Sequence, residues 1–269
     1  MTTPSIALTI AGSDSSGGAG IQADLKTFTA LGVYGASVIT ALTAQNTTGV
    51  SAIHTPDAEF VRAQMAAVLD DLTVGAIKTG MLANARIIAV VAEELARHPS
   101  PPVVVDPVMV ATSGDRLLDA DAVDIMRSRL FPRALVITPN LAEAAALLDA
   151  GRAGTLEEME RQGRELLRYG SRAVLMKGGH AAGDAKGSDL LITADGRRQV
   201  IAGRWLETRN THGTGCTLSA AITAGLALGR DLETAVADGL DFVHRAMAAA
   251  PGLGAGHGPL NHTVPAPPA

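Results

Sequence analysis

The chain has 269 residues, of which 47% are hydrophobic and 18% are charged, and its aromatic residues are four phenylalanines, two tyrosines and one tryptophan. This composition excludes a disordered chain. The single cysteine, Cys216, excludes an intrachain disulfide framework and favours a reducing, cytoplasmic setting. The formal net charge of −5 provides no overall basic surface, so we expect no nucleic-acid partner.

The sequence indicates neither a targeting signal nor a membrane span. No basic residue precedes the first apolar run, 6–10, and Gly12 ends that run too early for a signal peptide. The most apolar stretch, 220–229, is shorter than the ~20 residues that cross a bilayer. We therefore expect no membrane partner. We also expect one domain over residues 1–263 and a disordered tail at 264–269.

Short apolar runs of strand length alternate with segments of helical spacing along the whole chain. The expected strands are 6–10, 37–42, 76–79, 103–106, 135–138, 173–176 and 189–192. The expected helices are 21–31, a segment capped by Thr55 with Pro56 in its first turn, 85–98, 120–130, 141–149, 156–169, 215–228 and 232–249. Residues 188–201 are expected to form a β-hairpin with a type I′ turn at 194–196. The alternation predicts a three-layer α/β/α sandwich on a mostly parallel sheet, with ligands at the carboxyl edge of the strands.

Two glycine clusters open helices. The first, at Gly12, Gly17, Gly18 and Gly20, follows the first strand. Its spacing matches neither the dinucleotide fingerprint nor the P-loop, and we favour a ligand-facing loop over a tight structural turn.

The second cluster contains Gly213, Thr214, Gly215 and Cys216, at the start of the expected helix 215–228. Successive amide N–H groups at a helix start make an anion site. Cys216 lies in the first helical turn, where the helix lowers thiol pKa values and favours the thiolate. Whether Cys216 acts as a base or only lines the pocket stays open.

Three further strands each deliver one charged residue to the same edge of the sheet: Asp106, Glu143 and Lys177. Asp106 and Glu143 can hold Mg²⁺ through water, and Lys177 can neutralise a transferring phosphoryl group. Glu143 also follows Asn140 by three residues, which matches a capping box. The seven histidines show no metal-ligand spacing, which disfavours zinc chemistry.

Together these motifs resemble the ribokinase-like small-molecule kinases, and within them the hydroxymethylpyrimidine/phosphomethylpyrimidine kinases of thiamin biosynthesis. The matching stretches are Ala11–Thr27, Thr40–Thr47, Lys78–Leu82, Val105–Met109, Thr138–Glu143, Met176–His180 and Thr211–Cys216. The resemblance implies a ribokinase-like fold and ATP-dependent phosphorylation of 4-amino-5-hydroxymethyl-2-methylpyrimidine to its monophosphate and then its pyrophosphate. It also implies a homodimer.

The resemblance assigns roles residue by residue. It implies that Asp24 and Gln45 hold the pyrimidine, with Gly12, Met81 and Val108 beside it. A carboxamide such as that of Gln45 offers one donor and one acceptor, which suits an aminopyrimidine. The phosphate side, by the same resemblance, consists of Asp106 and Glu143 for Mg²⁺, Lys177 and Asn140 for ATP, and Gly213 to Cys216 as the anion hole. The wider superfamily usually has Asp at the position of Cys216.

Two other functions stay open. One is a pyridoxal or pyridoxine kinase of the same superfamily, and the other is a non-catalytic pyrimidine-binding sensor. A nicotinamide-dependent oxidoreductase is disfavoured because the dinucleotide fingerprint is missing. The segment 111–115 is expected to fold over the phosphates as a lid.

Overall fold

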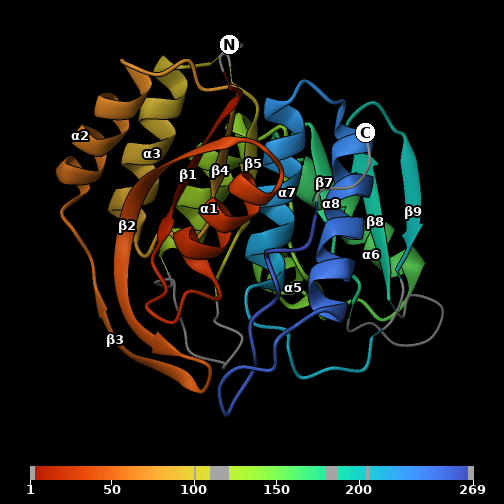
Figure 1. Ribbon diagram of the computed structural model, residues 1–269. Coiled ribbons are helices and arrows are strands. Elements are labelled where there is room, and N and C mark those ends of the chain that lie inside the picture. The colour runs from red at the N-terminus through yellow and green to blue at the C-terminus, as the bar shows by residue number, and fades with distance from the viewer. Residues whose placement is uncertain (1–3, 100, 110–120, 180–186, 204–205, 266–269) are drawn as a thin grey trace.

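The computed structural model describes residues 4–99, 101–109, 121–179, 187–203 and 206–265. Within them, a nine-stranded sheet has helices on both faces (Figure 1). The strands are β1 (Ile6–Gly12), β2 (Tyr34–Asn46), β3 (Gly49–His54), β4 (Ala76–Thr79), β5 (Val103–Val105), β6 (Val136–Ile137), β7 (Ala173–Met176), β8 (Ser188–Thr193) and β9 (Arg198–Ala202). The helices are α1 (Gly20–Ala30), α2 (Ala58–Leu69), α3 (Ala85–Arg97), α4 (Ala122–Ile125), the π-helical η1 (Met126–Leu130), the 3-10 helix η2 (Phe131–Arg133), α5 (Leu141–Leu148), α6 (Leu156–Leu167), α7 (Thr214–Ala227) and α8 (Leu232–Ala248).

The sheet reverses its order beside β1. The strand order is β3-β2-β1-β4-β5-β6-β7-β8-β9, with parallel pairing from β2 to β7 and antiparallel pairing of β3, β8 and β9 at the two ends. From β1 the chain passes through α1 to β2 on one side, and after β3 and α2 it returns to β4 on the other side of β1. Such a switch point opens a crevice at the carboxyl ends of the strands, where ligands bind in open α/β sheets.

Alternating strand residues bury opposite faces of the sheet. Leu8 and Ile10 of β1 pack in the larger core cluster, together with side chains of α2 to α6. Ala7, which directly precedes Leu8, packs with Phe28 of α1 and small residues of α7 on the opposite face. Helix α8 joins that second face through a separate cluster under β5 to β8. The predicted three-layer α/β/α architecture is confirmed.

Two local predictions were wrong, and one strand was missed. Helix α2 begins at Ala58, because the carbonyl of Asp57 rather than Thr55 accepts the first helical N–H groups. The strand β3 was not predicted; it pairs antiparallel with β2 and forms the edge of the sheet. In the β8–β9 turn, Gly196 donates to the carbonyl of Thr193 and is the one turn residue with positive φ. A type I′ turn needs positive φ at both central residues, so this hairpin has a longer loop in which Gly196 is left-handed.

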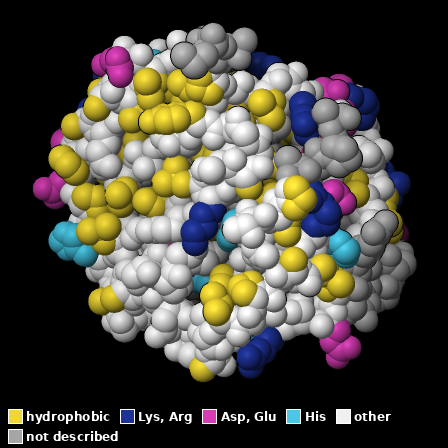
Figure 2. Space-filling model, viewed as in Figure 1, with side chains coloured by type: hydrophobic (Ala, Val, Ile, Leu, Met, Phe, Trp, Pro, Cys, Tyr) yellow, Lys and Arg dark blue, Asp and Glu magenta, His cyan; other side chains and the backbone are white. Residues whose placement is uncertain are grey.

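The surface formed by β2, β3 and α2 carries apolar side chains, which gather at the left of the view in Figure 2. Tyr34, Leu42, Ile53 and Phe60 are the large exposed apolar residues of these elements. In the described part of the chain, no helix is long and apolar enough to span a bilayer. At the C-terminus, Val264 packs against the core and the carbonyl of Pro265 accepts from Arg245, so the described part of the expected tail is anchored.

Candidate active site

A cavity of about 150 Å³ lies at the carboxyl edge of the sheet, beside the switch point. Its walls come from the ends of β1, β2, β4 and β5, from the turns that follow β6 and β7, and from the start of α7. Most of the expected site residues line it: Gly12, Gln45, Met81, Val108, Asp106, Asn140, Glu143, Lys177, Gly213, Gly215 and Cys216. Residues scattered over more than 200 positions of sequence therefore share one cavity.

The charged end of the cavity is organised around Lys177. Its Nζ is 3.1 Å from Oδ1 of Asp106 and 3.9 Å from Oε2 of Glu143. Burial alone would lower the pKa of Lys177, but the two carboxylates raise it, so the ammonium stays charged. Asp106 also accepts hydrogen bonds from the hydroxyl groups of Thr138 and Ser219, each at 3.2 Å. The result is a fixed arrangement of charge among largely buried side chains, where electrostatic effects are strong.

Glu143 forms the capping box that its spacing predicted, and it also lines the cavity. Its carboxylate accepts from the N–H of Asn140 at 2.8 Å, while the Asn140 side chain accepts from the N–H groups of Ala142 and Glu143, so the capping box is present. Both residues also line the cavity. Burial, together with the negative charge of Asp106, raises the pKa of Glu143 to about 7 despite Lys177. Ionisation of Glu143 is therefore unfavourable, because the group is buried and lies near a second carboxylate. An additional cation at this point would stabilise the ionised form.

The start of α7 presents backbone N–H groups to the cavity. Gly213 is the N-cap with φ +79°, and a Cβ at this position would lie 1.9 Å from the carbonyl oxygen of Gly18, so only glycine fits. Thr214 donates its N–H and its hydroxyl to the carbonyl of Thr211, which removes it from the expected set of free donors. The N–H groups of Gly215 and Cys216 have no partner among the described residues. These two groups and the helix dipole can receive an anion.

The prediction for the thiol of Cys216 was wrong. Burial raises its pKa to about 11; the positive charge of Lys78 lowers it, and the negative charges of Asp24 and Asp106 raise it. Desolvation and the nearby carboxylates of Asp24 and Asp106 therefore outweigh the effect of the helix N-terminus on the pKa of the thiol. In the resting protein Cys216 is a neutral thiol at neutral pH.

The opposite end of the cavity is less polar. Met81 and Val108 form an apolar wall with Gly12, where an added Cβ would come within 3.0 Å of the sulfur of Met81. Gln45, at the end of β2, is half-buried, and its Oε1 accepts from the hydroxyl of Thr43 at 3.1 Å. A flat ring can lie on this wall with a carboxamide at its edge.

Asp24 does not reach the cavity. Its carboxylate is fully buried under the floor, where Nζ of Lys78 donates to both oxygens at 2.6 and 2.7 Å and the hydroxyl of Thr9 donates at 2.6 Å. The expected direct contact of Asp24 with the pyrimidine is therefore corrected: its partner is the ammonium of Lys78, which does line the cavity. Sequence gave no sign of this pair, because the two residues are 54 positions apart.

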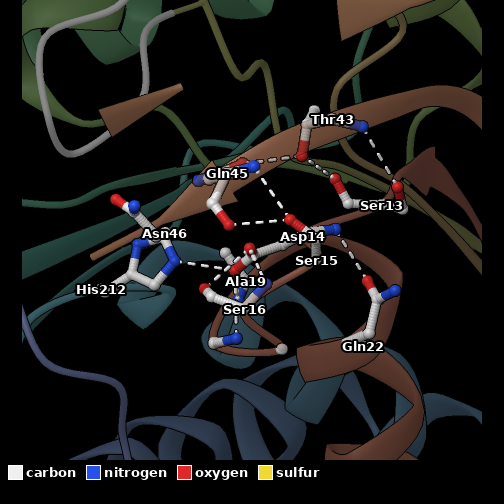
Figure 3. Close-up of polar contacts among 12 residues, drawn as sticks. Ser13, Asp14, Ser15, Ser16, Ala19, Gln22, Thr43, Gln45, Asn46 and His212 are labelled. Atoms are coloured by element: carbon white, nitrogen blue, oxygen red, sulfur yellow. Dashed lines mark hydrogen bonds and ion pairs between the residues drawn. The ribbon is translucent and has the colours of Figure 1, made fainter. Parts of the chain in front are cut away.

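Two more residues were missed by sequence reasoning. Asp14, in the first glycine-rich loop, and His212, just before Gly213, form a buried hydrogen bond beside the cavity (Figure 3). Both lie inside motifs that were singled out, but their side-chain partners depend on tertiary packing. The expected lid, 111–115, lies outside the described residues.

A second, more apolar cavity of about 590 Å³ adjoins the start of α7. It lies between β8, β9 and α8, and its walls include Ile201, Leu240 and Val243. Thr211 and Thr214 line it from the loop that leads into α7. A ligand that bridges the two cavities would pass over the N-terminus of this helix.

A model of the phosphomethylpyrimidine kinase family matches residues 14–261 of the chain. The hydroxymethylpyrimidine/phosphomethylpyrimidine kinase of Rhizobium meliloti is 56% identical over 259 residues, which cover 96% of this chain and 96% of that protein.

Two solved structures share the fold. The ADP complex of Bacillus subtilis pyridoxal kinase is 36% identical, with a TM-score of 0.89 over 97% of this chain and 98% of the other. The phosphomethylpyrimidine kinase of Clostridium difficile 630 is 42% identical, with a TM-score of 0.79 over 90% of this chain and 98% of the other.

Proposed function

The chain belongs to the phosphomethylpyrimidine kinase family, and from this premise we propose that it transfers the γ-phosphoryl group of ATP to 4-amino-5-hydroxymethyl-2-methylpyrimidine and then to the resulting monophosphate. The family and its relatives are kinases, so the chain is a phosphotransferase and a purely sensory role is not supported. The observation that carries the proposal is the cavity at the switch point, which has an apolar wall at one end and Lys177 with two backbone amide donors at the other.

The acceptor would lie on Met81, Val108 and Gly12, with Gln45 at its polar edge. The side-chain amide supplies one donor and one acceptor, which match the exocyclic amine and neighbouring ring nitrogen of an aminopyrimidine. The hydroxymethyl group would then face Cys216 and the start of α7, which line the same cavity. Asp24 contributes indirectly, because it holds the ammonium of Lys78 at the floor of the same cavity.

The phosphate end would act by positioning and charge. The N–H groups of Gly215 and Cys216 would receive the transferring phosphoryl group, and Lys177 would neutralise its developing charge. Phosphoryl transfer needs little covalent chemistry from the protein. A neutral thiol at Cys216 is therefore compatible with catalysis, and its backbone amide is the group we assign to the anion hole.

Mg²⁺ fits the residues that are present. Asp106 and Glu143 offer the carboxylate oxygens that magnesium prefers, and because burial raises the pKa of Glu143, a bound cation would favour its ionised form. Magnesium beside phosphates is commonly held by one or two carboxylates together with phosphate oxygens, which is the number of carboxylates that this cavity offers. When bound, the ion would shield the phosphate charge.

The adenine of ATP would occupy the apolar cavity beside α8. This cavity shares the start of α7 with the catalytic cavity, and its lining of Ile201, Leu240 and Val243 suits a planar base. The ADP complex of the pyridoxal kinase shows that a protein of this fold holds an adenine nucleotide. That observation supports ATP as the phosphoryl donor here.

Pyridoxal is the second candidate acceptor, because the pyridoxal kinase of Bacillus subtilis has the higher TM-score of the two structures described above. A coupled assay that follows ADP release with hydroxymethylpyrimidine, its monophosphate and pyridoxal side by side distinguishes the acceptors. We expect both pyrimidines to be phosphorylated with kcat/KM well above that for pyridoxal. Preference for pyridoxal would overturn the proposal.

We also propose that the protein is a cytoplasmic homodimer that associates through the β2–β3 hairpin. β3 is an edge strand, and the hairpin exposes Leu42 and Ile53. An apolar open edge is a template for association with another chain. Sedimentation equilibrium should give twice the chain mass for the wild type and the single-chain mass for Ile53→Lys, whereas a monomeric wild type would refute the proposal.

A further inference from the structure

Two loops that are far apart in the sequence are joined by a buried hydrogen bond beside the active-site cavity. Asp14 lies in the loop between β1 and α1, and His212 lies just before α7, 198 positions later. Nε2 of His212 is 2.8 Å from Oδ2 of Asp14, and the exposed fractions of their side chains are 5% and 1%. None of the roles assigned above uses this pair.

The carboxylate of Asp14 is saturated with donors. Oδ1 accepts from the N–H of Ser16 at 2.9 Å and from its hydroxyl at 2.8 Å, and Oδ2 accepts from the N–H groups of Gly18 at 3.0 Å and Ala19 at 2.8 Å. Burial alone would raise the pKa of Asp14, but hydrogen bonds, foremost that of His212, lower it to about 2. A charged carboxylate only accepts hydrogen bonds, so Nε2 of His212 carries the proton and donates it.

The neighbouring residue, Ser15, forms hydrogen bonds with the backbone of Gln45, the proposed acceptor-recognition residue. Its hydroxyl donates to the carbonyl of Gln45 at 2.7 Å and accepts from the N–H of Gln45 at 2.9 Å. Figure 3 shows both sets of contacts in one view: Ser15 with Gln45, and Asp14 with His212. Two consecutive residues thus connect the proposed acceptor-recognition residue with the loop that precedes the anion hole.

The two loops are also closely packed against each other. A Cβ at Gly18 would lie 2.5 Å from the ring of His212, and a Cβ at Gly213 would lie 1.9 Å from the carbonyl oxygen of Gly18. On its far side, the backbone of His212 donates to the carbonyl of Gly258 at 3.1 Å. The anion-hole loop is therefore held between the glycine-rich loop and the C-terminal segment.

We propose that Asp14 and His212 are positioning residues that fix the anion hole relative to the acceptor site. In-line transfer requires the reacting atoms to be held about 3–3.5 Å apart, and a shift of about 1 Å can cost a hundredfold in rate. The hydrogen bond from His212 to Asp14 joins the loop that carries the anion hole to the loop that holds Gln45. This inference rests on the proposed function, because it takes these two places as the phosphoryl and acceptor sites.

The test compares two polar replacements that differ by one methylene. In His212→Gln the side-chain amide can place its nitrogen near the position of Nε2 and still donate to Asp14. In His212→Asn the amide is too short to reach Asp14. His98→Leu, at the end of α3 and away from the cavity, serves as a control for the loss of a histidine. Melting temperatures select an assay temperature at which every variant is folded.

We expect kcat of His212→Asn to fall by about 30-fold or more, with the acceptor KM changed less than about threefold, because Gln45 is held separately by Ser15. More ATP should be hydrolysed per acceptor phosphorylated. His212→Gln should keep kcat within about fivefold of the wild type, and His98→Leu should match the wild type. Unchanged kcat in His212→Asn, or equal losses in the two amide variants, would overturn the proposal.

The readouts separate this proposal from the proposed function. If the wild type prefers pyridoxal, the substrate assignment fails, and the same comparison is made with pyridoxal as the acceptor. A second readout needs no activity: hydrogen exchange of the Gly18 and Ala19 amides, which donate to Asp14, should be faster in His212→Asn than in His212→Gln. Equal exchange in the two variants would count against the link.

Discussion

The ammonium of Lys78 lies 2.6 Å from Oδ1 of Asp24, and neither side chain has any exposed surface. This fully buried ion pair links β4 to α1 directly beneath the active-site cavity. Burial alone would lower the pKa of Lys78, but the charge of Asp24 raises it, so the lysine remains an ammonium. The pair therefore brings a positive charge to the cavity floor without exposing its counter-charge there.

Breaking this pair should destabilise the protein strongly. Lys78→Met leaves a buried carboxylate without its partner and should lower the free energy of unfolding by about 3–5 kcal/mol. The double variant Lys78→Met/Asp24→Asn, which keeps an acceptor for Thr9, should be more stable than Lys78→Met alone. Urea unfolding measures both. Arg164→Ala, which removes a partly exposed ion pair with Glu160, should cost less than about 1 kcal/mol; a similarly small loss for Lys78→Met would contradict the prediction.

Gln45→Leu tests acceptor recognition. The leucine leaves the polar edge of the pyrimidine unpaired, which should cost about 1–3 kcal/mol and raise the acceptor KM by about 5- to 150-fold. ATP hydrolysis in the absence of acceptor should change little. Steady-state kinetics with varied acceptor measure the effect, and Gln199→Leu on the exposed strand β9 is the matched control. An unaltered acceptor KM would exclude the pairing.

Ala237→Trp tests the adenine cavity. Ala237 is an exposed residue of α8 that lines this cavity, so an indole there would fill space needed by the base without disturbing the core. We expect the KM for ATP to rise by at least about tenfold while the acceptor KM stays within about twofold. Ala248→Trp, also exposed on α8 but outside the cavity lining, should leave both constants unchanged. Equal kinetics for the two variants would place the adenine elsewhere.

The protonation state of Cys216 can be measured directly, because it is the one cysteine of the chain. With a pKa of about 11, about one thiol in a thousand is ionised at pH 8. The rate of alkylation by iodoacetamide in the ligand-free protein should rise about tenfold per pH unit from pH 7 to 10. In the urea-unfolded chain the rate should level off near pH 9. If the rate for the folded protein instead levels off below pH 8, the thiol has a lowered pKa and the prediction is wrong.

Asp14 should stabilise the fold in acid. Its pKa is lowered to about 2 from the ordinary 3.8, so its contribution is complete above about pH 4 and is lost as the pH falls through 2. This linkage amounts to about 2 kcal/mol. Between pH 4.5 and 2, Asp14→Asn should lose that much less stability than the wild type, as measured by urea unfolding. The control Asp71→Asn, at an exposed position, should show the same dependence of stability on pH as the wild type. If Asp14→Asn also loses as much stability as the wild type between pH 4.5 and 2, the prediction for Asp14 is wrong.

The sequence by itself determined the architecture and the location of the site. Apolar runs and helical spacing are local properties, so strands such as β4 and helices such as α7 were predicted at nearly their observed positions. Charged residues that end parallel strands meet at one edge, which brought Asp106 and Lys177 together on topological grounds alone. The anion site at the start of α7 was predictable because a helix start and its backbone N–H groups are local features.

Only the tertiary structure decided the environment of individual side chains. Asp24 pairs with Lys78 across 54 positions and Asp14 with His212 across 198, and no local pattern reports such partners. The pKa of Cys216 depended in the same way on burial and on charges from distant strands, which outweighed the helix N-terminus that the sequence revealed. Backbone periodicity is local, whereas desolvation and charge pairing arise only when the chain has packed, and this is why the sequence located the site but did not assign the partner of each group.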